Sequence, residues 1–346
     1  MSVARLLITE SEKHRPRQYF RRAEYIYLRK GKNNMSKYAF GVDVGGTTVK
    51  IGLFDKEGTV LDKWEVPTRK ENNGENVLPD VAKSLLAKMQ EKGIAEADLA
   101  GIGIGAPGAV DDNGTLVGGA VNIGWPVFNI PEVMQSYINV PVKAANDANA
   151  AAFGELWQGG GKGCNDMVAV TLGTGVGGGI IVGGRLLVGA TGAGGEIGHI
   201  HLEDNETEAC GCKNKGCLEQ YASATGIVRL AKRRLAKDDQ PSVLREGELS
   251  AKSVFDAVKA GDAVAIEIAK QFGEYLGKGL AAVAGVVNPE IFVIGGGVSK
   301  AGEILLSFVE PEFQKYAFQQ CRGAKFALAT LGNDAGIYGA AGLILR

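Results

Sequence analysis

Short apolar runs alternate along the chain with segments in which apolar residues recur at every third or fourth position. The runs predict buried strands, and the helical spacing predicts amphipathic helices. Strands and helices that take turns in this way are typical of an α/β protein. We expect strands at 38–44, 49–54, 100–106, 140–145, 167–172, 180–184 and 290–294. We expect helices at 77–92, 148–157, 223–237, 250–259 and 262–286.

Two glycine-rich turns join pairs of these strands. FGVDVGGTTVKIGLF (40–54) and AVTLGTGVGGGIIVGG (169–184) share one plan of strand, glycine turn and strand, which favours two domains of related build. The second turn formally matches G-x-G-x-x-G, but a dinucleotide fingerprint needs a helix after the loop, and β-branched residues follow here. Neither turn contains the Gly-Lys-Ser/Thr of a P-loop.

The glycine turns still suit phosphate, because consecutive backbone N–H groups in a tight turn form a nest for anions. Asp43 is placed to orient Mg²⁺ or its water shell, and Lys50 to neutralise charge. A third glycine cluster, followed by Ser299 as the expected helix N-cap, suits a nucleoside. Tight hairpins without a ligand are the structural alternative. The predicted ATP and phosphate residues are Asp43, Gly45, Gly46, Thr47, Thr48, Lys50, Gly173, Thr174, Gly175, Gly177, Gly295, Gly296 and Gly297.

Three of the five cysteines lie within eight residues, at Cys210, Cys212 and Cys217. With His199 or His201 upstream they make Cys₃His, a structural zinc set, and spacing alone leaves the choice of histidine open. Buried free thiols, the alternative, fit poorly in a polar loop. An odd, clustered count is unlike a secreted disulfide framework, so a reducing, cytoplasmic compartment is expected.

Asn146 and Asp147 lie where the strand at 140–145 meets the helix at 148–157. An Asp at such a junction commonly caps the helix. In a kinase, a carboxylate so placed accepts the proton of the attacking hydroxyl. Glu196 lies in a glycine-rich turn, and a carboxylate is able to accept two neighbouring hydroxyls of a ligand. Ordinary surface charges are the alternative for Glu196 and Glu219.

Composition narrows the partners of this chain of 346 residues. A net charge of −1 gives no general reason to expect nucleic acid as a binding partner. No apolar run is long enough for a membrane span. Residues 1–34 differ, with nine Lys or Arg against three Glu. We expect a poorly ordered extension there, with Met35 as a natural start. A transit peptide and a nucleic-acid-binding arm are the alternatives.

Taken in order, the motifs of this chain resemble those of the ROK family of sugar kinases and repressors, and above all its bacterial glucose-phosphorylating members. The resemblance covers residues 37–346. One departure is Lys213, where the family usually has Gly after the second Cys. The motifs are Asp43-x-Gly-Gly-Thr-x-x-Lys50, Asn146-Asp147, Gly173-Thr174-Gly175-x-Gly177, Gly195-Glu196-x-Gly198-His199 and Cys210-x-Cys212…Gly216-Cys217-x-Glu219.

The resemblance implies the two-domain actin-like ATPase (ribonuclease H-like) fold of the α/β class, with the active site in the interdomain cleft. We divide the chain accordingly into a basic extension, a small domain completed by a C-terminal helix, and a large domain that carries the zinc loop. The extension covers 1–36, the small domain 37–145 with 334–346, the large domain 146–333 and the zinc loop 199–217.

The implied activity is phosphorylation of D-glucose by Mg-ATP, with Asp147 as general base. Asn146, Asp147, Glu196, His199 and Glu219 would contact the sugar, and His199 would complete the zinc site. A homodimer is also implied. The alternatives are another hexose (N-acetylglucosamine, N-acetylmannosamine, fructose or allose), polyphosphate as donor, and a sugar-responsive transcriptional regulator, which would need an N-terminal DNA-binding domain longer than the basic extension.

Overall fold

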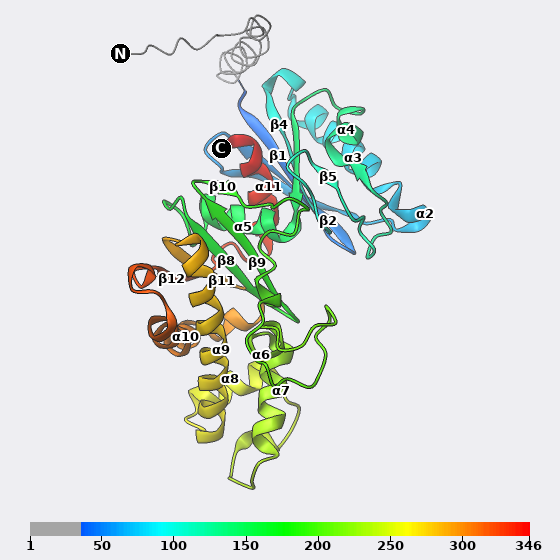
Figure 1. Ribbon diagram of the computed structural model, residues 1–346. Coiled ribbons are helices and arrows are strands. Elements are labelled where there is room, and N and C mark those ends of the chain that lie inside the picture. Colours follow the sequence, from blue (N-terminus) through cyan, green and yellow to red (C-terminus); the bar gives the residue numbers. More distant parts are fainter. Residues whose placement is uncertain (1–35) are drawn as a thin grey trace, which may run out of the picture.

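The computed structural model describes residues 36–346, and the basic extension predicted at the N-terminus lies outside this range except for its last residue. The described chain is built on two five-stranded mixed sheets with helices between and around them (Figure 1). This is the α/β class that the alternating pattern predicts. No helix in residues 36–346 has the length and apolar character needed to cross a membrane.

The first sheet has the strand order β3-β2-β1-β4-β7. Its first three strands are antiparallel, and β4 and β7 then add in parallel. Helix α3 covers this sheet and buries its apolar positions in one core with the strands. The strands are β1 (Tyr38–Val44), β2 (Thr48–Asp55), β3 (Val60–Pro67), β4 (Leu99–Ala106) and β7 (Val142–Asn146). The remaining elements here are α2 (Glu71–Gly74), α3 (Val77–Lys92), β5 (Thr115–Leu116), β6 (Phe128–Asn129) and α4 (Ile130–Gln135).

The second sheet repeats this plan in the order β10-β9-β8-β11-β12. Strands β8, β9 and β10 are antiparallel, and β11 and β12 add in parallel. The likeness between the two glycine hairpins in the sequence thus extends to the whole of both sheets. The strands are β8 (Met167–Leu172), β9 (Val176–Val182), β10 (Arg185–Leu186), β11 (Ile291–Gly295) and β12 (Lys325–Leu328).

Helices packed on the second sheet form the largest core. Three of them begin at side-chain caps: Ser223, Ser250 and Asp262 each accept a backbone N–H of the first turn, which stabilises a helix start by about 1 kcal/mol. The helices are α6 (Glu219–Ala222), α7 (Ala224–Leu235), α8 (Ala251–Lys259), α9 (Ala263–Val287) and α10 (Glu303–Tyr316).

Helices α5 (Asp147–Gln158) and α11 (Ala335–Leu345) lie between the two sheets (Figure 1). They pack on each other, while α11 also lies on β1 and β4 and α5 on β9. Glycines let the backbones touch. A Cβ on Gly339 would lie 1.6 Å from the carbonyl oxygen of Ala150, and one on Gly103 would lie 1.7 Å from that of Ala340.

Two local predictions are wrong. The strand expected at 180–184 begins at Val176, because Gly178 and Gly179 are strand residues packed under other backbone and leave no room for a Cβ. Ser299 is not a helix N-cap. It lies in a short 3₁₀ turn, its hydroxyl donates to the carbonyl of Gly296, and the helix α10 begins after Gly302.

The contact between α5 and α11 makes a stability prediction. Gly339→Ala adds a methyl group where no space exists. We therefore expect the free energy of unfolding to fall by about 2 kcal/mol or more, despite the better helix propensity of Ala. Gly285→Ala, exposed in the last turn of α9 with open space around it, is the control and should gain up to about 0.5–1 kcal/mol. The shift of the urea midpoint measures both. Equal stability of the two variants would contradict the packing described here.

Candidate active site

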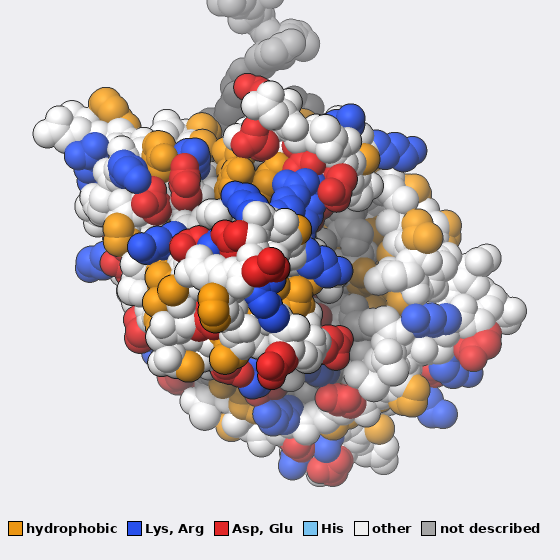
Figure 2. All heavy atoms as spheres, turned by 90° about the horizontal axis from the view of Figure 1, so that it is seen from below, with side chains coloured by type: hydrophobic (Ala, Val, Ile, Leu, Met, Phe, Trp, Pro, Cys, Tyr) orange, Lys and Arg blue, Asp and Glu red, His pale blue; other side chains and the backbone are white. Residues whose placement is uncertain are grey.

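The predicted site residues come from both sheets and from the helices between them. Asp43 lies in β1, opposite Lys50 of β2 and beside Gly105 of β4. Asp147 begins α5, and its Cα would lie 3.8 Å from a Cβ on Gly105. The two aspartates therefore lie close together, and both are neighbours of Gly105 in β4. In Figure 2 the molecular surface is hollowed between two parts of the chain, with charges of both signs along the rim.

Asn146, and not Asp147, is the N-cap of α5. Its side-chain oxygen accepts from the backbone N–H of Ala148 (3.0 Å) and Asn149 (3.2 Å). Its amide donates to the carbonyl of Gly108 and to Oδ1 of Asp147, both at 2.9 Å. This amide thus ties the turn after β4 to the candidate base.

Asp147 keeps one carboxylate oxygen available. Oδ1 accepts from the N–H of Ala148 and from Asn146, whereas Oδ2 has no hydrogen-bond partner within residues 36–346. The side chain is open to solvent, yet protein surrounds it on several sides. This partial desolvation raises the pKa of Asp147, against hydrogen bonds from the backbone N–H of Ala148, the side chain of Asn146 and its own backbone N–H, which lower it. One oxygen is held and the other is free to accept a proton.

The neighbouring carboxyl of Asp43 is more strongly affected. Burial, followed by repulsion from the charge of Asp147, raises the pKa of Asp43 to about 6, and the Lys50 ammonium opposes the rise. A pair of carboxylates that are partly buried and lie close together attracts a cation. This electrostatic setting fits the role of orienting Mg²⁺ that the sequence suggests for Asp43.

Hydrogen bonds to and from the backbone of Gly45 close the first glycine turn. Gly45 N donates to the carbonyl of Thr48 at 3.1 Å, and the Thr68 hydroxyl donates to the carbonyl of Gly45 at 2.7 Å. Lys50 donates to the backbone carbonyl of Asn333 at 3.1 Å. Lys50 therefore links the first sheet to the segment just before α11.

The second glycine turn is attached to the helices that follow the zinc loop. Ala224 N donates to the carbonyl of Gly173 (2.8 Å), and the Thr225 hydroxyl donates to that of Thr174 (2.7 Å). A Cβ on Gly175 would lie 2.5 Å from Oε2 of Glu219. The candidate phosphate turn and a candidate sugar carboxylate are thus in contact. Gly177 lies inside β9, opposite Thr171.

The structure brings His199 together with the three clustered cysteines. One ligand atom from each of His199, Cys210, Cys212 and Cys217 lies within 4.8 Å of all the others. Thiolate and imidazole donors in this number are the set that binds zinc with no open position. His201 points elsewhere: its Nε2 pairs with Asp204 and its Nδ1 with the carbonyl of Lys215. The choice that spacing left open falls on His199, and the residues fit a zinc ion.

The unusual Lys213 stands at a left-handed backbone position with φ of 72°. Glycine adopts this conformation without strain, and other residues pay roughly 1 kcal/mol. The turn is kept by two hydrogen bonds, Lys213 N to Cys210 O and Cys210 N to Asn214 O. The substitution of Lys for the usual Gly therefore leaves the cysteines together.

The three predicted sugar residues also converge. His199 Nδ1 lies 3.7 Å from Oε1 of Glu219, on the side of the cysteines, and Nε2 lies 4.0 Å from Oε2 of Glu196. The two ring nitrogens thus face different partners, so Nδ1 is able to bind a metal while Nε2 faces Glu196. Glu219 also accepts from the Cys210 thiol at 2.8 Å.

The third glycine cluster lines a cavity of about 530 Å³ with α5, β8 and the segment before α11. The cavity has the size of a small-ligand site. Gly295, Gly296 and Gly297 all line it, whereas neither glycine turn does. Gly296 has a φ of 85° and packs on Leu172, so only glycine fits there.

Sequence reasoning missed Glu155 of α5. Its buried carboxylate accepts from the backbone N–H groups of Gly160 (2.9 Å), Thr330 (3.1 Å) and Leu331 (2.9 Å). It therefore holds the wall of this cavity. A carboxylate on the apolar side of a helix was the available signal, but the three partners that satisfy it are distant or unremarkable in the sequence.

Comparison with known proteins agrees with this geometry. The sequence model of the ROK family matches residues 39–346. The glucokinase of Halalkalibacterium halodurans is 42% identical over 89% of this chain and 95% of its own. A crystal structure of a ROK family glucokinase from Streptomyces griseus in complex with glucose and AMPPNP has a TM-score of 0.64 and 35% identity, over 88% of this chain and 98% of its own. The xylose repressor of Bacillus subtilis is more distant, at 28% identity over 90% of this chain and 78% of its own.

The chain belongs to the ROK family. The predicted actin-like ATPase fold is confirmed by the solved structures that this chain resembles.

Proposed function

We propose that this protein is a glucokinase, which transfers the γ-phosphoryl group of ATP to D-glucose and yields ADP and glucose 6-phosphate. The observation that carries the proposal is the 42% identity to a glucokinase over nearly the whole of both chains. The candidate base Asp147 and the polar cluster at Glu196, His199 and Glu219 support it. The first is able to accept a proton, and the second is able to hydrogen-bond the hydroxyls of a sugar.

Asp147 is the proposed general base. Its Oδ1 is fixed by Asn146 and the start of α5, so the free Oδ2 accepts the proton of the sugar hydroxyl as that hydroxyl attacks phosphorus. Asn146 positions this carboxylate and binds the sugar from the same turn. Glu196, Glu219 and His199 Nε2 hydrogen-bond the remaining hydroxyls.

The two glycine turns are proposed to hold the phosphates of ATP, and the cavity at Gly295–Gly297 its nucleoside. Asp43 orients the Mg²⁺ that accompanies ATP, and Lys50 and the Thr47 and Thr48 hydroxyls complete this side of the site. Because the turns belong to different sheets, we propose that the domains divided at 145 and 333 approach when both substrates bind, which excludes water from the reacting phosphate.

Zinc is proposed to be structural. His199, Cys210, Cys212 and Cys217 would hold it, and a closed four-ligand site supplies rigidity and no reactive position. The ion would fix the loop at 199–217, and with it the orientation of His199 and the neighbouring Glu219. The absence of paired, secretory cysteine spacing supports the cytoplasm as compartment. A homodimer is proposed from the family resemblance alone.

Another hexose as acceptor, polyphosphate as donor and a regulator are the competing functions. A coupled ADP-release assay with Mg-ATP compares glucose, mannose, fructose, N-acetylglucosamine, N-acetylmannosamine and allose. We expect glucose to lead in kcat/KM by roughly a hundredfold or more, about 2.7 kcal/mol of transition-state preference. A different leading sugar would overturn glucose as the substrate, and turnover of none would favour the other donor or the regulator.

Replacement of the proposed base makes a second prediction. Asp147→Asn keeps the size of the side chain but cannot accept the proton, so we expect kcat to fall by roughly 100-fold or more. Glucose affinity, measured by calorimetry, should stay within a few-fold. Asp256→Asn, which removes a carboxylate from an exposed ion pair with Lys252, is the matched control and should retain activity. Near-wild-type kcat in Asp147→Asn would rule out this base.

The zinc site makes a third prediction. Metal analysis should find one zinc per chain, and Cys212→Ser should lose it and raise the KM for glucose roughly tenfold, with a smaller effect on the KM for ATP. Cys164→Ser, outside the cluster, is the control and should keep both the metal and the kinetics. A zinc-free protein with unchanged kinetics would refute a supporting role for the ion.

A further inference from the structure

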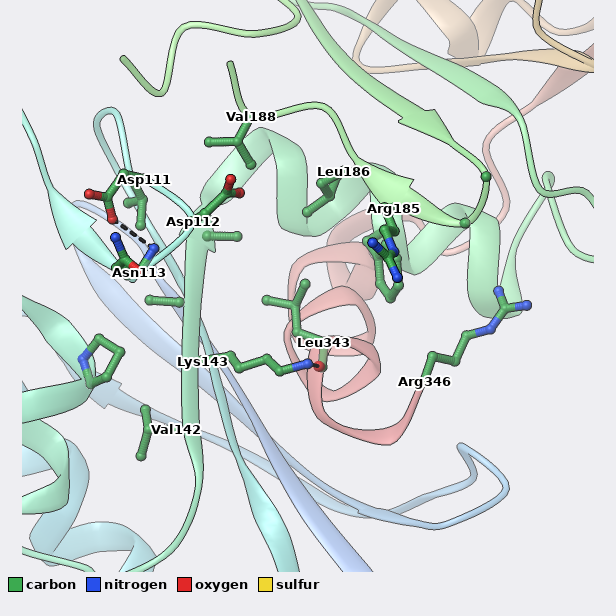
Figure 3. Close-up of a pocket in the computed structure, with 18 residues that line it drawn as sticks. Asp111, Asp112, Asn113, Val142, Lys143, Arg185, Leu186, Val188, Leu343 and Arg346 are labelled. Atoms are coloured by element: carbon green, nitrogen blue, oxygen red, sulfur yellow. Dashed lines mark hydrogen bonds between the residues drawn. The ribbon is translucent and has the colours of Figure 1, made fainter. Parts of the chain in front are cut away.

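We propose that a second ligand site, separate from the active site, lies in the side cavity: a cavity of about 630 Å³ between the two sheets (Figure 3). Its ligand is a small phosphorylated polyol, of which a hexose phosphate is the simplest example. Residues on one of its walls belong to β7 and the turn after β4, and those on the other to the β9–β10 hairpin and the end of α11.

The side cavity lies away from the proposed phosphate turn at Gly173–Gly175, although Ala145, which lines it, directly precedes the proposed sugar residue Asn146. None of the residues proposed to bind sugar, phosphate or zinc lines it. The hairpin at Gly183–Leu186 stands at the far end of β9 from the phosphate turn at Gly173–Gly175. Seven strand residues at about 3.3 Å each separate the two by roughly 20 Å.

Two guanidinium groups on one side of the cavity are available to an anion. Arg185 and Arg346 line it and are exposed, and within residues 36–346 neither side chain makes a hydrogen bond or ion pair. The other arginines in the described chain are all engaged with carboxylates or carbonyls. Arginine pairs with phosphate through two parallel N–H donors, which makes these groups suited to a phosphate ester.

Oxygen and amide groups on the opposite side suit hydroxyls. Figure 3 shows Asp111, Asp112 and Asn113 across the cavity from the two arginines. Asp111 builds its own turn by accepting from Asn113 N at 2.9 Å, whereas Asp112 is exposed and has no partner among the described residues. A carboxylate next to a bare phosphate would repel it. A ligand that carries its phosphate at one end and its hydroxyls at the other satisfies both sides.

Part of the cavity lining is apolar. Leu186, Val188 and Leu343 belong to it, and the Lys143 side chain extends beside Leu343 and donates to its backbone carbonyl (Figure 3). Such a surface packs on the carbon face of a sugar ring or an extended polyol, and an ion without carbon gains nothing from it. Together the three surfaces distinguish a phosphorylated polyol from inorganic phosphate.

Both walls lead directly into the active site. Three residues before Asp111, the carbonyl of Gly108 accepts from the amide of Asn146. Eight residues after Val188 the chain reaches Glu196, and between them Gly192 packs against Ala109. A ligand that bridges the walls therefore fixes the spacing of two segments that carry sugar contacts. We expect it to alter glucose affinity by holding one relative position of the sheets.

Equilibrium binding tests this site with the active site filled. Calorimetry is run on the full chain in saturating glucose and AMPPNP, with glucose 6-phosphate, fructose 6-phosphate and inorganic phosphate as probes. The choice of glucose 6-phosphate rests on the proposed function, since it is the product of that reaction. We expect one hexose phosphate to bind per chain, and Arg185→Gln to weaken its binding roughly tenfold. Arg322→Gln, outside the cavity, is the matched control.

Asp112→Ala separates recognition of the polyol from that of the anion. It should weaken hexose phosphate and leave inorganic phosphate unchanged. The site is refuted if no probe binds to the filled enzyme, if Arg185→Gln binds as the wild type does, or if inorganic phosphate binds as tightly as the esters. Failure of the proposed function would appear separately. Glucose or AMPPNP would then show no binding when each is titrated into the enzyme before the probes are added.

Discussion

The direct backbone contact between α5 and α11 is the constraint on which the rest of this structure depends. Glycines remove the side chains that would hold the two helices apart, and α11 meets β1 and β4 in the same way. Interiors packed to this density transmit position with little slack. The start of α5 is therefore fixed relative to the end of β1, and with it the relation of Asp147 to Asp43. The proposed roles of Asp147 and Asp43 therefore depend on the contact between α5 and α11.

The second sheet adds the other half of the site through a chain of attached segments. The zinc loop leads into Glu219, Glu219 touches Gly175, and α7 is bonded to the turn at Gly173 and Thr174. A buried carboxylate strengthens this attachment: Glu206 of the loop pairs with Arg229 and Arg233 of α7. Sugar recognition and phosphate binding thus share one rigid support. The candidate metal ligands His199, Cys210, Cys212 and Cys217 therefore lie close to Glu219 and the second glycine turn.

The sequence predicts those parts of the molecule that depend on local pattern. Apolar runs locate the two glycine hairpins, and close cysteine spacing locates the zinc loop. Packing between distant segments decides the rest. His199 and His201 are equivalent by spacing, and only the fold turns His201 toward Asp204. Ser299 looks like a helix cap, but the chain makes a 3₁₀ turn there before α10. The role of Glu155 cannot be predicted from its place on the apolar side of a helix, because its partners at Thr330 and Leu331 lie far along the chain.

The proposed function depends above all on proton transfer from the sugar to the Asp147 carboxylate, which is held at the junction of the two sheets. Its most direct test is the pH dependence of kcat/KM for glucose from about pH 5 to pH 8 at saturating Mg-ATP. Because partial burial raises the pKa of Asp147 above its ordinary value of 3.8, we expect activity to fall at the acidic end. Asp43, with a pKa of about 6, also titrates in this range, so we expect the residual activity of Asp147→Asn to keep only a shallower fall, shifted to lower pH. A flat wild-type profile, or the same acidic fall in the variant, would contradict this role of Asp147.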